Sequence, residues 1–233
     1  MKTKKPIVCV IIPAFNEAEA IGRVIKDIPE MVDEIVVVNN NSSDNTQEVA
    51  QDAGATVLYE KRRGYGYACL IGMAYFDQRQ VKPEIIVFLD GDHSDFPEEI
   101  EKLIAPIVSS NMDFVIGARV KSLREVGSLT PQQIFGNWLA CFLMKVLYNA
   151  RYTDLGPFRA IRFESLKALK MTDKTYGWTV EMQLKALNSK LSYCELPVKY
   201  RKRIGQSKVS GTLKGAIFAG INIIGWILKY GMR

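Results

Sequence analysis

The segment IIVFLDGDHSDFP, residues 85–97, is the clearest indication of the fold class of this chain. It begins with an apolar, mostly β-branched run, which is typical of a strand buried on both faces of a parallel sheet. The strand is predicted to end at Asp90, where a polar turn holds two more aspartates and the only histidine of the chain. Phe96 and Pro97 then open a predicted helix over residues 98–108. A strand, a polar turn and a helix in this order form one βα unit.

The same alternation extends in both directions from this stretch. Strands are predicted at residues 6–12, 34–39, 55–59, 84–90 and 113–118, and helices at residues 17–28, 44–53, 67–76 and 98–108. Ser43 is predicted to be the N-cap of the second helix. Repeated βα units with continuous apolar strands predict an α/β fold, in which an open, twisted, mostly parallel sheet carries helices on both faces.

The alternation ends after Arg119. Thr130, Pro131 and Gln133 form the pattern of a capping box and predict a helix that runs to Tyr148. Beyond it we predict a turn-rich stretch at residues 153–162, helices at residues 164–169 and 179–188, and a strand at residues 191–200 that Pro197 interrupts.

The chain is predicted to divide into a sheet domain, residues 1–210, and a C-terminal apolar helix, residues 211–233. Residues 215–228 are apolar apart from Asn222 and are flanked by Lys214 and Lys229. This segment and the helix at residues 134–148 are short for a membrane span. Cationic flanks suit a helix lying in a membrane surface, which we favour. The alternative is that one segment is an ordinary core helix and the other a contact in a homodimer.

The composition limits the partners and the compartment. The 233 residues carry a net charge of +6, which suits a phosphorylated ligand, an anionic membrane or nucleic acid. Nucleic acid is disfavoured because the predicted strands are aliphatic and lack the exposed aromatic platforms of RNA-binding sheets. The four cysteines have no metal-binding spacing, so we expect buried free thiols and a cytoplasmic location, at most peripheral to the membrane.

Four polar segments follow the first four predicted strands: PAFNE (13–17), NNNSSDNT (39–46), KRRGYG (61–66) and DGDHSD (90–95). The carboxyl ends of parallel strands meet at one edge of the sheet, which is where open α/β sheets bind ligands. The basic, glycine-containing third segment precedes a helix and is predicted to attract phosphate.

Asp90 and Asp92 offer hard oxygen ligands at a spacing that suits Mg²⁺ or Mn²⁺. The alternative is a solvated acidic loop. In both cases Asp95 is predicted to serve the next helix as its cap. His93 directly follows Asp92, so its ring is expected to point away from the aspartate pair.

The ordered set of PAFNE, NNSSDNT and DGD resembles the family 2 glycosyltransferases, which have the GT-A fold. TDLGPFRAIR (153–162), YGWTVEMQ (176–183) and ELPVKYRKRIGQSK (195–208) are similar to the dolichyl- or polyprenyl-phosphate mannose or glucose synthase branch. The resemblance covers residues 6–208. It implies a Rossmann-like nucleotide-sugar-binding domain with acceptor-side helices near its C-terminus.

The resemblance also implies roles for individual residues. The nucleotide sugar would be bound by Pro13, Ala14, Glu17, Asn39, Asn40, Arg63, Asp90, Gly91 and Lys208. The metal would be held by Asp90, Asp92 and Ser94. The acceptor would be bound by Arg119, Arg124, Arg159 and Arg201. The catalytic candidates are Asp92, Asp154, Glu181 and Arg203, and Arg201, Arg203 and Lys208 lie on a loop that could close over the diphosphate.

These expectations describe a metal-dependent, inverting transfer of a hexose from a nucleotide sugar. Asn39 stands where the family usually has aspartate, which favours a UDP-sugar over a GDP-sugar. A polyprenyl phosphate acceptor needs no general base, whereas a hydroxyl acceptor needs a carboxylate such as Asp154 or Glu181. Turn capping by Asp154 and stabilisation of a helix N-terminus by Glu181 remain alternatives. A nucleotidyltransferase and a non-catalytic nucleotide-binding module fit the motifs less well.

Overall fold

The computed structural model describes residues 5–205 and 213–231, and it contains one seven-stranded sheet. The strands are β1 (Val8–Ala14), β2 (Glu34–Asn39), β3 (Thr56–Tyr59), β4 (Ile85–Phe88), β5 (Phe114–Ala118), β6 (Arg159–Arg162) and β7 (Tyr193–Pro197). The helices are α1 (Ile21–Asp27), α2 (Thr46–Asp52), α3 (Tyr65–Gln78), the 3₁₀ helix η1 (Pro97–Glu99), α4 (Ile100–Ser109), α5 (Pro131–Tyr148), α6 (Phe163–Ala168), α7 (Trp178–Asn188) and α8 (Leu213–Gly231).

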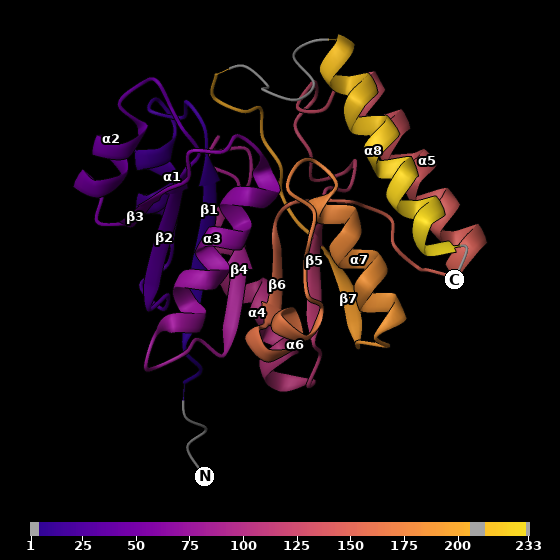
Figure 1. The fold of residues 1–233 in the computed structure, drawn as a ribbon, viewed down its shortest axis with the longest axis horizontal. Coiled ribbons are helices and arrows are strands. Elements are labelled where there is room, and N and C mark those ends of the chain that lie inside the picture. Colours follow the sequence, from indigo (N-terminus) through magenta and orange to yellow (C-terminus); the bar gives the residue numbers. More distant parts are fainter. Residues whose placement is uncertain (1–4, 206–212, 232–233) are drawn as a thin grey trace.

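The strand order is β3-β2-β1-β4-β6-β5-β7, which Figure 1 shows from left to right. The pairs β1–β2, β1–β4, β2–β3 and β5–β7 are parallel, and only the two pairs made by β6 are antiparallel. The predicted α/β fold with a mostly parallel sheet is therefore confirmed.

The prediction of a turn-rich stretch at residues 153–162 is wrong in its second half, because β6 is a strand in the middle of the sheet. An arginine at each end hides it from a search for apolar runs. Arg159 is fully buried and donates to the carbonyl oxygens of Gly156 (3.1 Å), Leu155 (3.2 Å) and Thr179 (3.0 Å). A charge in the core is tolerated here because these carbonyls satisfy the guanidinium.

Helices cover both faces of the sheet, as predicted. One core layer packs the sheet against α1 and α4, and the other packs it against α3, α5 and α7. Within β1, Val8, Val10 and Ile12 face the first layer, whereas Cys9 and Ile11 face the second. Burial on both faces is what makes a parallel strand read as a continuous apolar run.

The predicted helix starts are right in some places and wrong in others. The capping box of α5 is present, with Thr130 and Gln133 bonded reciprocally. Ser43 is not the N-cap of α2, because that helix begins at Thr46 and the Asp44 carboxylate accepts from the Thr46 amide at 3.1 Å. Aspartate is as good a local acceptor as serine, and the pattern alone does not choose between them.

The helices α5 and α8 lie side by side beyond the β7 edge of the sheet (Figure 1). Trp226 of α8 donates its indole N–H to Asp173 at 2.6 Å, and the Tyr148 hydroxyl donates to the Ile227 carbonyl. Within the described ranges, the search for a helix long and apolar enough to cross a bilayer found none. The division at residue 210 stays a prediction.

The four cysteines are free thiols, as predicted. Cys9, Cys69 and Cys141 are buried, whereas Cys194 is half-buried. Burial raises the pKa of the Cys9 thiol to about 12, so it stays protonated and unreactive at neutral pH.

Candidate active site

The four polar segments meet at the carboxyl ends of β1 to β4. Backbone hydrogen bonds join their bases: the Asn40 amide donates to Ala14 O at 2.8 Å, and the Glu60 amide donates to Asn39 O at 2.9 Å. The Leu89 amide donates to Ile11 O at 3.2 Å. The convergence predicted from the strand order is therefore present.

The segment after β1 is held against the segment after β2. Pro13 and Ala14 are the buried last residues of β1. The Glu17 amide donates to Thr46 Oγ1 at 2.8 Å, which fixes the turn before α1. Asn39 accepts from the Ser42 amide at 2.9 Å through Oδ1, and its amide nitrogen donates to Gln47 Oε1 at 3.3 Å.

Asn40 holds the basic segment 61–66 in place. Its amide nitrogen donates to Arg62 O at 2.7 Å, and its amide oxygen accepts from the Gly64 amide at 2.7 Å. Gly64 has φ of +149°, and a Cβ there would lie 2.1 Å from Lys174 O, so only glycine fits. The Arg63 guanidinium lies 4.7 Å above the Phe15 ring, which brings a cation to the PAFNE segment.

Asp92 is buried, and its two carboxylate oxygens have different partners. Oδ1 accepts from the Ser94 amide at 2.9 Å and from the Ser94 hydroxyl at 2.5 Å. Oδ2 forms an ion pair with Arg203 Nη2. Gly91, between the two aspartates, is buried against Ile21 and Glu17.

Asp90 presents a carboxylate oxygen, Oδ1, that is buried and makes no hydrogen bond within the described residues. Burial, and then the neighbouring charge of Asp92, raise the pKa of Asp90 to about 6. The buried hydroxyl of Tyr65, a residue not selected by the sequence analysis, makes no hydrogen bond of ordinary geometry in the described part of the chain. It interacts with Asp90, and burial together with this interaction raises the pKa of Tyr65.

Asp95 does not cap the following helix, so that prediction is wrong. The N-cap of η1 is Phe96, and Asp95 is 1% exposed with both carboxylate oxygens free of hydrogen bonds to described residues. Its backbone instead forms a bridge with Tyr200. Burial, together with the charges of Asp90 and Asp92, raises the pKa of Asp95 well above its ordinary value.

His93 turns away from the aspartate pair, as expected. It has φ of +62°, and its Nε2 lies 2.8 Å from Asp27 Oδ2 at the end of α1. Arg201 joins the same cluster, because it donates to His93 O at 2.6 Å and to Asp27 Oδ2 at 3.3 Å. These contacts with Asp27 and Arg201 hold the backbone of segment 90–95 in place.

The residues present fit a divalent metal ion whose coordination is completed by a ligand. Asp90 Oδ1 is an orphaned buried oxygen, and Asp92 and Ser94 add further hard oxygens. Within residues 5–205 and 213–231, no group of three or more His, Cys, Asp or Glu side chains is placed to hold a metal by itself. Magnesium commonly uses one or two carboxylates and fills its remaining positions with phosphate oxygens and water.

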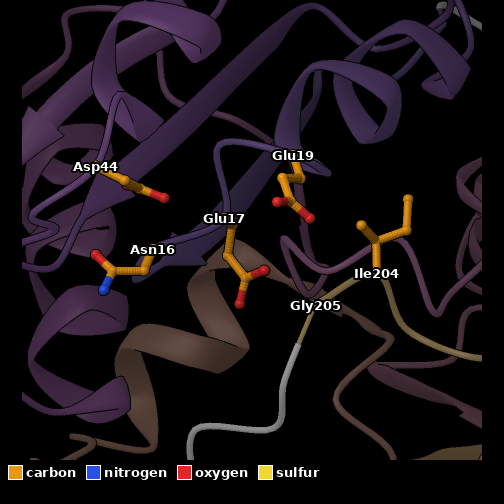
Figure 2. A pocket seen from close by; sticks show the side chains of 6 residues that line it. All are labelled: Asn16, Glu17, Glu19, Asp44, Ile204 and Gly205. Atoms are coloured by element: carbon orange, nitrogen blue, oxygen red, sulfur yellow. The ribbon is translucent and has the colours of Figure 1, made fainter.

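A pocket of about 140 Å³ lies beside Glu17 (Figure 2). Asn16, Glu17, Glu19 and Asp44 line it from the β1 and β2 segments, and Ile204 and Gly205 face them. Glu17 also lies near Arg203, because its Oε1 is 3.8 Å from Arg203 Nη2.

Arg119, the first of the residues predicted to bind the acceptor, directly follows β5. Its amide, Nε and Nη2 all donate to the Asp154 carboxylate, at 2.7, 2.8 and 2.6 Å. The Arg119 guanidinium also lies 5.3 Å above the Tyr200 ring. Arg124 pairs with Tyr200 through its backbone, and its guanidinium has no ion-pair partner in the described residues.

Three other predicted residues have their charged groups engaged elsewhere. Glu181 is fully buried and accepts from the Thr172 and Asp173 amides, at 2.9 and 2.8 Å. Arg159 donates to the three carbonyl oxygens described above. Arg201 donates to His93 O and to Asp27 Oδ2. Their proposed catalytic and acceptor roles stay predictions, and Lys208 lies outside the described residues.

Comparison with known proteins gives a consistent result. The profile of the family described as glycosyl transferase family 2 matches residues 9–170. An uncharacterised glycosyltransferase of Mycobacterium tuberculosis is 32% identical over 91% of this chain and 94% of its own. A dolichyl-phosphate hexose transferase of Haloferax volcanii is 28% identical over 96% of this chain and 95% of its own. A UDP-N-acetylglucosamine–dolichyl-phosphate N-acetylglucosaminyltransferase of Methanococcus voltae is 26% identical over 83% and 85%.

Among solved structures, the chain is similar to glucosyl-3-phosphoglycerate synthase of Mycobacterium tuberculosis in complex with Mn²⁺, UDP-glucose and phosphoglyceric acid. The TM-score is 0.80 at 20% identity, over 97% of this chain and 80% of the other. At this identity the likeness concerns the fold, and it confirms the predicted GT-A architecture.

Proposed function

The chain belongs to glycosyl transferase family 2, and from this premise we propose that it transfers a hexose from a nucleotide sugar to the phosphate of a polyprenyl phosphate. Two of its relatives are named as transferases to dolichyl phosphate, which supports this acceptor class. UDP-sugars are the preferred donors, because Asn39 has no charge with which to bind a guanine edge.

The observation that carries the phosphate acceptor is the pairing of Arg119 with Asp154. A hydroxyl acceptor would need Asp154 or Glu181 as a base, but both carboxylates already accept several hydrogen bonds. Burial alone would raise the pKa of Asp154, and the charge and hydrogen bonds of Arg119 outweigh it and leave that pKa low. A phosphate is already anionic at neutral pH and needs no base, whereas it does need cations.

Arg119 and Arg124 supply those cations in this proposal. An acceptor phosphate oxygen attacks the anomeric carbon of the hexose, and the bond from that carbon to the diphosphate oxygen breaks on the opposite face. The nucleoside diphosphate leaves with the bonding electrons, and no proton is transferred. Inversion at the anomeric carbon follows from a single displacement.

The residues at the end of β4 stabilise the leaving group. Asp90 and Asp92 would hold Mg²⁺ or Mn²⁺, which as a Lewis acid neutralises the diphosphate. Arg63 and Arg203 add positive charge from the two neighbouring segments, and positioned charges of this kind lower the barrier by electrostatic stabilisation. The segments after β1 and β2 bind and orient the nucleoside.

A lipid acceptor places the reaction at a membrane surface, for which α5 offers a suitable face. Phe135, Trp138 and Phe142 are 61%, 56% and 47% exposed and contact one another along one side of the helix. Ile221 and Leu228 of α8 are also exposed, as are the cationic side chains of Lys145 on α5 and Lys229 on α8. Aromatic residues with cationic neighbours bind the interface of an anionic bilayer.

The test is a transfer assay with a panel of UDP- and GDP-hexoses and Mn²⁺, with and without polyprenyl phosphate. A lipid-linked hexose formed from a UDP-sugar supports the proposal. Transfer only to a soluble hydroxyl compound would replace the acceptor class, and absence of UDP binding in calorimetry, with or without Mn²⁺, would refute the transferase assignment.

A further inference from the structure

The segment 200–205 runs alongside the metal-binding segment 90–95 and is bonded to it along its length. The Arg201 amide donates to Ser94 O, and the Ile204 amide donates to Asp92 O, both at 2.9 Å. Tyr200 forms a backbone bridge with Asp95. These bonds fix the position of Arg203 relative to Asp92.

Arg203 reaches two carboxylates from this position. Its Nη2 forms the ion pair with Asp92 Oδ2 and lies 3.8 Å from Glu17 Oε1. Because Asp92 Oδ1 is already used by Ser94, Oδ2 is the Asp92 oxygen best placed to bind a metal, and Arg203 covers it.

The contact leaves Arg203 incompletely satisfied. Its Nε is buried without a hydrogen-bond partner in the described residues, and the side chain is 30% exposed. A guanidinium presents five N–H donors and binds diphosphate oxygens well. Arg203 is therefore the counter-ion of Asp92 and still has N–H donors that could bind an anion.

We propose that Arg203 is the cation that neutralises Asp92 in the metal-free protein, that a divalent ion takes its place on Asp92 Oδ2, and that the released guanidinium binds the diphosphate of the donor. This inference rests on the proposed function and adds an exchange of partners to it. In this proposal the Arg203 guanidinium covers the metal-binding oxygen of Asp92 until a nucleotide binds.

The exchange has a thermodynamic consequence. A metal that binds alone displaces Arg203 without giving it a new anion, so its affinity is lowered by the cost of the lost ion pair. A nucleoside diphosphate that binds with the metal provides that anion. Metal and nucleotide must therefore increase each other's affinity by the same factor.

The test is calorimetry with Arg203→Met, which removes the charge but keeps an apolar stem of similar length. Without nucleotide, the variant should bind Mn²⁺ about fivefold more tightly than the unmodified protein, because the competing ion pair is gone. With saturating Mn²⁺, it should bind UDP about tenfold more weakly, because a charge-assisted contact is lost. These opposite signs distinguish an exchanged residue from one that only supports the fold.

Lys202→Met is the matched control. Lys202 is the exposed neighbouring cation on the same segment, and its amide, which the variant retains, bonds Glu125 at 2.9 Å. Both affinities should stay within about twofold of the unmodified protein. The melting temperature, measured once in EDTA and once in Mn²⁺, gives a second readout. Arg203→Met leaves Asp92 without its partner, so Mn²⁺ should raise the melting temperature of the variant more than that of the unmodified protein.

The possible results distinguish a failure of the Arg203 exchange from a failure of the proposed function. If the unmodified protein binds Mn²⁺ and UDP but Arg203→Met binds Mn²⁺ alone no more tightly, the exchange is refuted and the transferase proposal stands. If neither protein binds Mn²⁺ under any condition, the exchange and the metal-dependent function are both refuted.

Discussion

Arg119 binds Asp154 through three donors of one residue, its amide and two guanidinium nitrogens, at 2.6 to 2.8 Å. Both side chains are nearly buried, at 13% and 6% exposed. A bidentate, buried pair of this kind fixes the guanidinium plane as well as its position. The arrangement makes Asp154 a positioning residue for the cation that we propose binds the acceptor.

Asp154→Asn should lower the free energy of unfolding by about 3 kcal/mol at pH 7, because it leaves the buried Arg119 charge without its counter-ion. The pKa of Asp154 is lowered from its ordinary value of 3.8, so its stabilising contribution is present above that value and is lost as the pH falls through the folded-state pKa. The difference between the two proteins should therefore be largest at neutral pH and shrink below about pH 4. Denaturant unfolding over this pH range measures it.

The control for that series is Asp77→Asn, which alters an exposed carboxylate paired with Lys82 and Lys167. Exposed pairs contribute little, so this change should lower the free energy of unfolding much less than Asp154→Asn does. An Asp154→Asn protein as stable as the unmodified one at pH 7 would contradict the importance of the Arg119 pair.

Asp92→Ala should abolish Mn²⁺-dependent UDP binding and lower sugar transfer at least about a hundredfold, because the metal loses a carboxylate and the diphosphate loses the metal. Calorimetry and a transfer assay measure the two effects, and far-UV circular dichroism reports whether the chain is folded. Asp52→Ala, at an exposed position at the end of α2, is the control. Turnover that survives in Asp92→Ala would remove this residue from the metal site.

Glu181→Gln separates a base from a structural carboxylate. Glu181 accepts from Thr172 and Asp173 and pairs with Lys185 at 2.8 Å, so the change should cost about 1–3 kcal/mol of stability. The transfer rate per folded molecule and its pH profile should be retained. A hundredfold slower transfer at unchanged melting temperature would instead assign Glu181 to the chemistry.

The double variant Trp138→Ser with Phe142→Ser should weaken binding to vesicles that contain anionic lipid by at least about tenfold, because two aromatic rings are removed from the membrane face. Sedimentation with liposomes measures this. Val81→Ser, at an exposed apolar position after α3, should leave binding unchanged. If the double variant changes the oligomeric state in light scattering and not the lipid binding, the face is a dimer contact.

The order of βα units and the edge at which ligands bind were predictable from local sequence patterns. A strand buried on both faces must be apolar throughout, and a helix buried on one side must repeat every three or four residues. These signals placed DGDHSD beside PAFNE and NNNSSDNT without knowledge of any contact. These patterns predict where the polar segments lie but not what their residues do. The roles of the residues are implied by the resemblance to family 2 glycosyltransferases.

The strand β6 was hidden because its defining features are not local. Arg159 reads as a surface residue, yet it is buried since three carbonyls from the loop before β6 and the start of α7 surround it. Asp95 is predicted to be a helix cap because it stands just before a helix, and the contacts that bury it are likewise not local in the sequence. Its burial depends on Tyr200, a residue 105 positions away in the chain that pairs with it through the backbone.

The α/β fold, the converging loops and the two aspartates at the end of β4 follow from local sequence patterns, because hydrophobic periodicity and strand ends are properties of neighbouring residues. The pairing of the charged side chains is a product of the folded chain. Arg119 faces Asp154, Arg201 faces Asp27, and Arg203 faces Asp92. Ion-pair partners are chosen by distance in space and by burial, and neither is encoded in the spacing of the residues along the chain.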